Sequence, residues 1–227
     1  MKILFKYPTR DRKEWFVSTL SKYYEQISDN CNFEFVISLN KDDSAMNNKT
    51  IQSYMNSFKC LSYFYGDHAN KILACNADID LKKEWDILVL VSDDMIPVVK
   101  NFDEVIAESM QKHFPDTDGA LHFNDGHEGD KRNITFSIIG RKLYERIGYV
   151  YHPDYKSFFC DNEFTDVVRS MDKYSYSEQV IVEHRHWSCK DTPPKDSLYC
   201  RNSKMGKPDK QTYLKRKSLQ FPNESVY

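Results

Sequence analysis

The segment that most constrains the fold of this chain is DILVLVSDDM, at residues 86–95. Five apolar residues run without interruption over 87–91, and two carboxylates, Asp93 and Asp94, follow after one serine. A strand that is apolar at every position, and not only at every second one, is buried on both faces, as in a parallel sheet covered by helices. The segment therefore predicts a central strand of an α/β sheet with two acidic groups at its carboxyl end.

The segments around this strand alternate between strand and helix patterns, which is typical of an open α/β sheet with right-handed crossovers. In chain order we expect strands at 2–7, 32–40, 60–65 and 86–95 with helices between them, a helix at 102–114, strands at 119–125 and 133–140, a helix at 160–171 and a strand at 176–187. Beyond Pro115 two strands follow each other without a long helix between them, so we expect antiparallel or mixed pairing there.

Composition narrows the class of protein. The 227 residues suffice for one large α/β domain, and the formal net charge of −2 gives no overall field towards nucleic acid or an anionic membrane. No apolar run approaches the roughly 20 residues that span a bilayer, and the N-terminus lacks a signal-peptide core, so we expect a soluble cytoplasmic protein. The cysteines lie singly without C-x-x-C spacing, which argues against a zinc ribbon and predicts mostly buried thiols at positions 31, 60, 75, 160, 189 and 200.

Polar residues follow each of the first four predicted strands. In open α/β sheets, ligands bind beyond the carboxyl ends of the parallel strands, which is where Asp93 and Asp94 fall. Loops are polar in any protein, so it is the coincidence with the acidic pair that gives the other positions weight. These positions are Thr9 and Arg10 after the first strand, Asp42 and Asp43 after the second, and Asp67, Asn70 and Lys71 after the third.

Paired carboxylates have three common uses. They bind a hard cation, share a proton, or cap a helix or turn, and Asp94 precedes a turn that leads to Pro97. A divalent ion would neutralise both Asp93 and Asp94 and leave coordination positions for phosphate oxygens. Oxygen ligands favour Mg²⁺ or Mn²⁺, and an added histidine favours Mn²⁺ or another transition metal.

A histidine is available in EHRHW, at 183–187. His184 and His186 stand two residues apart at the end of a predicted strand, so both side chains face the same side. Most isolated histidines are simply packed or solvated. We expect one of this pair to bind the metal and favour His184, because it lies closer to the strand.

Together these motifs resemble the GT-A-fold glycosyltransferases of the family-2 type, and in particular small soluble members associated with phages and viruses. The resemblance covers about residues 1–190. VSDDM departs from the usual D-x-D pattern, because Ser92 stands at the first acidic position. The segments that carry it are KYPTRDR (6–12), NKDDS (40–44), DHANKILACNADI (67–79), VSDDM (91–95) and CDNEF (160–164).

The resemblance implies a GT-A fold, with a mixed, mostly parallel central sheet flanked by helices. A donor-binding half at about 1–98 and an acceptor half at about 99–200 would precede a basic tail at 201–227. The implied activity is metal-dependent transfer of a sugar from a nucleotide-diphosphate sugar, by family habit a UDP-sugar, to a hydroxyl group, in the cytoplasm of a host if the chain is viral.

The resemblance also implies roles for the residues at the sheet edge. Base and ribose would lie near Thr9, Arg10 and either Asp42 or Asp43. Lys71, with Asn70 beside it, would lie near the base or the phosphates. Asp93 would approach the ribose, and Asp94 would bind an Mn²⁺ or Mg²⁺ ion that bridges the diphosphate.

Transfer with inversion also needs a carboxylate that takes the proton of the attacking hydroxyl. By resemblance, CDNEF supplies Asp161 as the base and Glu163 as its neighbour or an acceptor ligand; the other interpretation of Asp161 is a helix cap, and a retaining enzyme would not need it as base. Asn124 and Asp125 in HFNDG would face the donor sugar and acceptor, although the segment also suits a tight turn. The aromatic residues of 149–159 suit a packed loop better than a sugar-stacking surface.

Two other activities use the same residue types. One is a nucleotidyltransferase or another phosphoryl-transfer enzyme, although the chain has no P-loop. The other is a non-catalytic module that binds a nucleotide-sugar or carbohydrate. The acceptor stays open between a glycan, a protein, a small molecule and a modified DNA base. Residues 201–217 carry seven Lys or Arg against Asp209, which predicts either a solvated extension or a docking surface for a phosphate-bearing acceptor.

Overall fold

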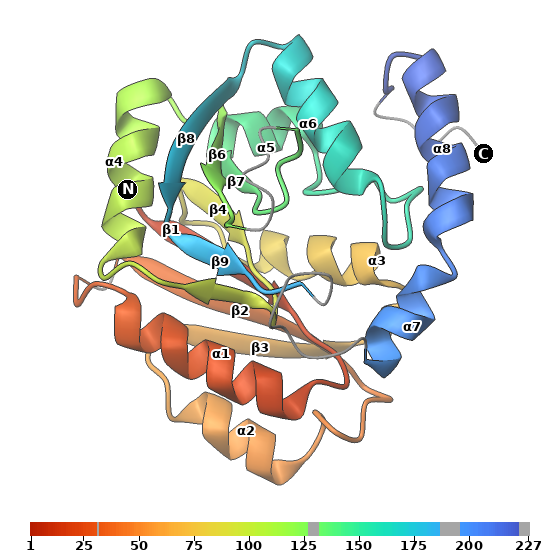
Figure 1. Ribbon diagram of the computed structural model, residues 1–227. Coiled ribbons are helices and arrows are strands. Elements are labelled where there is room, and N and C mark those ends of the chain that lie inside the picture. The colour runs from red at the N-terminus through yellow and green to blue at the C-terminus, as the bar shows by residue number, and fades with distance from the viewer. Residues whose placement is uncertain (31, 127–131, 187–195, 223–227) are drawn as a thin grey trace.

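A seven-stranded sheet, in the order β3-β2-β1-β4-β7-β6-β8, forms the centre of the computed structural model, which describes residues 1–30, 32–126, 132–186 and 196–222 (Figure 1). Its strands are β1 (Ile3–Pro8), β2 (Phe33–Asn40), β3 (Leu61–Gly66), β4 (Ile87–Leu90), β6 (Ala120–Asn124), β7 (Ile138–Gly140) and β8 (Tyr174–Val180). β1 pairs in parallel with β2 and β4, and β2 with β3, whereas β7 is antiparallel to β4 and β6. β8 is parallel to β6. The predicted mixed, mostly parallel sheet is confirmed.

Different helices cover the two faces of the sheet, because side chains alternate along each strand. In β1, Phe5 and Tyr7 pack on the face covered by α1, α2 and α4, whereas Leu4 packs on the face covered by α3, α5 and α6. β4 is buried at all four positions, as its continuous apolar run predicts. The helices are α1 (Lys13–Gln26), α2 (Lys49–Asn56), α3 (Lys71–Asn76), the 3-10 turn η1 (Ile79–Leu81), α4 (Phe102–His113), α5 (Arg141–Ile147) and α6 (Cys160–Ser170).

One predicted strand is in fact two. The single strand expected over 176–187 divides, since β8 ends at Val180 and β9 (Val182–His184) joins β5 (Met95–Pro97) in a separate antiparallel sheet. Apolar–polar alternation marks a strand but does not name its partner, so the change of sheet leaves no trace in the sequence. Its consequence is that Met95, the neighbour of Asp94, lies opposite His184.

The basic C-terminal segment is helical and partly buried, which corrects the expectation of a solvated extension. The predicted tail starts at 201, within α7 (Ser197–Ser203), and contains α8 (Gly206–Ser218), which packs beside α6 (Figure 1). The Asp209 carboxylate accepts hydrogen bonds from the backbone N–H groups of Ser157 and Phe158, each at 2.8 Å. Arg216 is completely buried and pairs with Glu163 at 2.8 Å. The charged groups of Asp209 and Arg216 therefore attach the segment to the domain.

The thiols divide between core and surface. Cys75 and Cys160 are buried thiols, as predicted, whereas the thiols of Cys60 and Cys200 are exposed. Cys31, Cys189 and Trp187 lie outside the described residues. Among the helices of the described ranges, none has the length and apolar character needed to cross a bilayer.

Candidate active site

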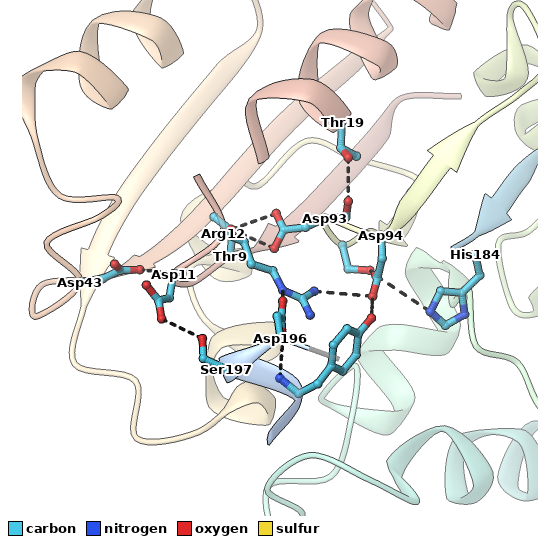
Figure 2. A network of polar contacts seen from close by, with 12 residues as sticks. Thr9, Asp11, Arg12, Thr19, Asp43, Asp93, Asp94, His184, Asp196 and Ser197 are labelled. Carbon is cyan, nitrogen blue, oxygen red and sulfur yellow. Dashed lines mark hydrogen bonds and ion pairs between the residues drawn. The ribbon is translucent and has the colours of Figure 1, made fainter. Parts of the chain in front are cut away.

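Asp93 and Asp94 lie just beyond β4, at the edge of the sheet where β1 also ends, and both are almost fully buried, at 3% and 5% exposure (Figure 2). Their side chains are held by different partners. For Asp93, the Thr9 hydroxyl donates to Oδ1 at 2.9 Å and the Tyr7 hydroxyl donates to the same atom at 3.1 Å. Thr19 of α1 donates to the Asp93 carbonyl at 2.7 Å. Asp93 is therefore fixed towards β1.

Asp94 is held from three other directions. Ser92 donates to its Oδ1, Tyr199 of α7 donates to its Oδ2, and Nη1 of Arg12 lies 3.6 Å from Oδ2. Burial raises the pKa of Asp93 to about 7, a shift that Arg12 and Thr9 only partly offset. Burial acts on Asp94 in the same direction, but His184 and the hydrogen bonds from Ser92 and Tyr199 lower the pKa of Asp94 to about 2. Asp94 is thus the carboxylate that stays charged at neutral pH.

His184 stands between two acids. Its Nε2 lies 3.9 Å from Oδ1 of Asp94, and its Nδ1 lies 3.5 Å from Oδ2 of Asp125. The His184 backbone N–H also donates to the Asp125 carbonyl at 2.8 Å. The rings of His184 and His186 are 5.6 Å apart between centroids, so the predicted common side is confirmed. A carboxylate therefore lies near each ring nitrogen of His184, as in carboxylate–histidine–metal arrangements.

The structure does not gather all the predicted metal ligands. In the described ranges, no three side chains of His, Cys, Asp or Glu are arranged to hold a metal ion. Asp93 is directed towards Thr9 and Tyr7, and the His186 ring packs edge-on against Tyr199, with centroids 5.2 Å apart. Of the predicted ligands within the described ranges, Asp94 and His184 approach each other, with Oδ1 and Nε2 3.9 Å apart.

The other predicted residues at this edge of the sheet are partly exposed and partly structural. Arg10 makes two hydrogen bonds to the exposed carboxylate of Asp42, at 2.9 and 2.8 Å. Asp43 is buried and accepts the backbone N–H of Asp11 at 2.7 Å, which closes the loop. Asn70 caps α3, and Lys71 is the exposed first residue of that helix.

The acceptor-side predictions separate in the same way. Asp161 is half-buried in the first turn of α6; burial raises its pKa, and the charges of Lys71 and His184 lower it in part. Lys71 also interacts electrostatically with Asp94, so Asp161, Lys71 and Asp94 share one region. Glu163 instead accepts hydrogen bonds from Tyr155 at 2.6 Å and from Arg216 at 2.8 Å. These contacts attach α8 and do not join Glu163 to the acidic pair.

The turn at 124–126 has a structural and a site-facing residue. Asn124 accepts the backbone N–H of Gly126 at 2.9 Å, and Gly126 adopts a φ of 71°. Asp125 is buried and supports His184. Of the aromatic residues at 149–159, Tyr151 and Tyr155 are buried, which matches the expected packed loop.

Sequence reasoning missed Arg12, Asp196 and Tyr199. Arg12 stands in KYPTRDR, but nothing in that motif indicates that its guanidinium turns towards Asp94. Tyr199 and Asp196 lie just before the predicted basic tail, where no site residue was expected, and Tyr199 is 105 positions from the aspartate that it contacts. No local pattern links such distant residues.

Comparison with known proteins identifies the fold. No protein-family profile matches the chain, and a search of curated proteins finds no match. Among solved structures, the mannosyltransferase PcManGT from Pyrobaculum calidifontis, in complex with GDP-Man and Mn²⁺, is similar with a TM-score of 0.65 at 15% identity over 88% of this chain. S. aureus TarS 1–349, in complex with UDP-GlcNAc, is similar with a TM-score of 0.65 at 16% identity over 88% of this chain.

This chain spans 59% of the PcManGT chain and 61% of the TarS chain, about three-fifths of each. At sequence identities this low, the similarity shows only that the backbones follow the same course. The chain therefore has the GT-A fold of these solved structures, with the acidic pair of β4, His184 and Asp161 at one end of the sheet.

Proposed function

We propose that the protein is a metal-dependent glycosyltransferase, which moves a sugar from a nucleotide-diphosphate sugar to a hydroxyl acceptor with inversion. The observation that supports this most is that the ionised carboxylate of Asp94 lies close to the His184 ring at the end of β4 in a GT-A fold. The resemblance of the sequence favours a UDP-sugar as donor.

A divalent cation fits the residues at this edge. Asp94 is ionised, and Nε2 of His184 faces it while Asp125 lies near the other ring nitrogen. Mg²⁺ sites in nucleotide enzymes commonly take one or two protein ligands and fill the remaining positions with water and substrate phosphates, so two ligands suffice. Once bound, Mn²⁺ or Mg²⁺ would offset the charge that develops on the leaving diphosphate.

The remaining residues are assigned to donor and acceptor. Thr9, Asp93 and the Arg10–Asp42 pair would face the nucleoside, and Lys71 would face the phosphates. Asp161 would take the proton of the acceptor hydroxyl while that oxygen bonds to the anomeric carbon. The bond from this carbon to the diphosphate breaks, and its electron pair leaves on the nucleoside diphosphate. Attack from the face opposite the leaving group inverts the configuration.

Donor turnover with Mn²⁺ tests the proposal in the wild type, Asp94→Ala and Asp161→Asn, with exposed Asp80→Asn as the control. We expect Asp94→Ala to lower turnover by about 100-fold or more and to remove the metal response. Asp161→Asn should lower transfer by about 10²–10⁴-fold while donor binding, read from the thermal shift, persists.

The same assay separates the competing activities. Donor binding without turnover by the wild type would identify a non-catalytic module. A nucleotidyltransferase would leave the nucleotide-sugars intact and would release pyrophosphate from a nucleoside triphosphate, which is supplied in a parallel reaction. A panel that contains UDP-sugars and GDP-sugars covers both nucleotides present in the similar solved structures.

A further inference from the structure

Arg12 is a buried cation at the centre of the site, and its three nitrogens are used unequally. The side chain is 7% exposed, and its Nε donates to Asp196 at 2.8 Å. Its Nη1 lies 3.6 Å from Asp94. The guanidinium carbon lies 4.3 Å from the centroid of the Tyr199 ring. Nη2 is buried and has no hydrogen-bond partner among the described residues. Figure 2 shows the guanidinium between Asp196 and Asp94.

A buried N–H donor without an acceptor is rare, because it has lost its water and gained nothing in return. A guanidinium is also planar and suited to holding phosphate or carboxylate oxygens with two nitrogens at once. Asp196 uses only Nε of Arg12. The other Asp196 oxygen accepts the backbone N–H of Tyr199, so the buried Nη2, next to the proposed diphosphate position, points to an anion that can place a second oxygen on the guanidinium.

α7 and its N-cap residue supply a partner to each of Arg12 and Asp94. Asp196 is the N-cap residue of α7 and binds the arginine, while Tyr199 of the same helix binds the aspartate. The Asp196 side chain is 30% exposed, so water and solutes can reach it. Release of one short helix would uncover the cation and the proposed metal ligand together.

We propose that Arg12 is a phosphate-binding residue of the donor site, and that Asp196 occupies it as an internal anion until a diphosphate displaces it. The inference rests on the proposed function, because the diphosphate would belong to the nucleotide-sugar. It adds to that function a third charged group, supplied by the loop after β1, and an internal competitor on α7.

Calorimetric titration separates a phosphate-binding arginine from a structural one. The probes are Mn²⁺ alone and pyrophosphate in the presence of Mn²⁺. Arg12→Gln should weaken pyrophosphate binding by about 10-fold or more, the range for hydrogen bonds to a charged group. The same change should leave Mn²⁺ binding unchanged or tighter, because a cation that competes for Asp94 is gone. A purely structural arginine would lower both affinities.

Asp196→Asn supplies the opposite change. Asparagine caps a helix as well as aspartate does, so α7 keeps its cap. The substitution removes only the negative charge that faces Arg12. Pyrophosphate should then bind about 3- to 10-fold more tightly, since an ionic competitor has been weakened. Arg141→Gln is the matched control, because Arg141 on α5 pairs with the exposed side chain of Glu145. A thermal melt confirms that each variant is folded.

Equal pyrophosphate affinities in the wild type and Arg12→Gln would overturn the inference, and so would an absence of pyrophosphate binding by the wild type. Parallel loss of Mn²⁺ and pyrophosphate binding in Arg12→Gln would also overturn it. If the donor panel shows no sugar transfer while pyrophosphate binding depends on Arg12, the proposed function fails and the phosphate site stands.

Discussion

Asp93 and Asp94 are neighbours in the chain with opposite electrostatic fates. Asp93 is buried against β1, where hydroxyl groups alone bond to its carboxylate, and its pKa rises to about 7. Asp94 faces Arg12 and His184, and its pKa falls to about 2. The charge of the pair therefore resides on Asp94, which makes that residue the better partner for a cation.

We predict that Asp93 makes the stability of the metal-free protein fall as the pH rises from about 4 to about 7. The folded-state pKa lies above the unfolded value, so the folded state binds more protons in this window and loses that advantage as the proton leaves. Asp93→Asn removes the effect and can still accept from Thr9. The difference in unfolding free energy between Asp93→Asn and the wild type should increase in favour of the variant by on the order of 4 kcal/mol across this window.

The measurement is urea unfolding in EDTA at a series of pH values, with exposed Asp80→Asn as the control. The difference between Asp93→Asn and the wild type should grow up to about pH 7 and then level off. Curves that stay parallel from acid to neutral pH would show that Asp93 is ionised throughout.

At the scale of elements, the sequence predicted those that have a strong internal pattern. The parallel strands, α1, α4 and α6 follow from apolar runs and from apolar residues at helical spacing. α5 was missed because seven residues give too little periodicity, and β9 because pairing with β5 is a tertiary choice. The role expected for Glu163 could have been questioned, since residues two apart on a helix lie about 200° apart and cannot both face one site.

α8 is attached through a buried ion pair, which gives a prediction for this element. Arg216 donates to both Glu163 oxygens and lies 3.5 Å from Asp154. Removing one partner of such a pair leaves an uncompensated buried charge, so Arg216→Met should destabilise the protein by about 3–5 kcal/mol. Lys210→Met on the exposed face of α8 should change stability by less than about 0.5 kcal/mol.

Chemical denaturation of both variants at the same pH is the appropriate measurement. A matched loss in Glu163→Gln would confirm that the pair acts as a unit. If Arg216→Met retained wild-type stability, α8 would be held by its apolar contacts, and the two buried charges would contribute nothing net.

At the scale of the whole molecule, the C-terminal segment returns to the site formed by the N-terminal half. Tyr199 reaches Asp94, 105 positions away, and Asp196 reaches Arg12, 184 positions away. The sequence predicted the edge of the sheet at which polar groups gather, because strand polarity dictates it. It could not predict α7 at that edge, because a helix of seven residues has too little pattern to show where it packs. The contacts of α7 with Arg12 and Asp94 are accordingly visible only in the tertiary structure.

The contacts of α7 with Arg12 and Asp94 lead to a prediction about motion. If a metal-bound diphosphate displaces Asp196 and Tyr199, α7 loses its two charged attachments while the loops that bind the ligand gain contacts. Amide hydrogen exchange at 197–203 should then become faster on addition of Mn²⁺ and a nucleoside diphosphate, by about 5-fold or more, while exchange at 9–12 and 92–95 becomes slower. The opposite signs within one sample exclude a general change in stability. Asp196→Asn, which retains the cap but weakens the attachment, should show part of the acceleration without ligand. Slower exchange at 197–203 on ligand addition would mean that α7 closes over the donor, and that its contacts with Arg12 and Asp94 are kept when the donor binds.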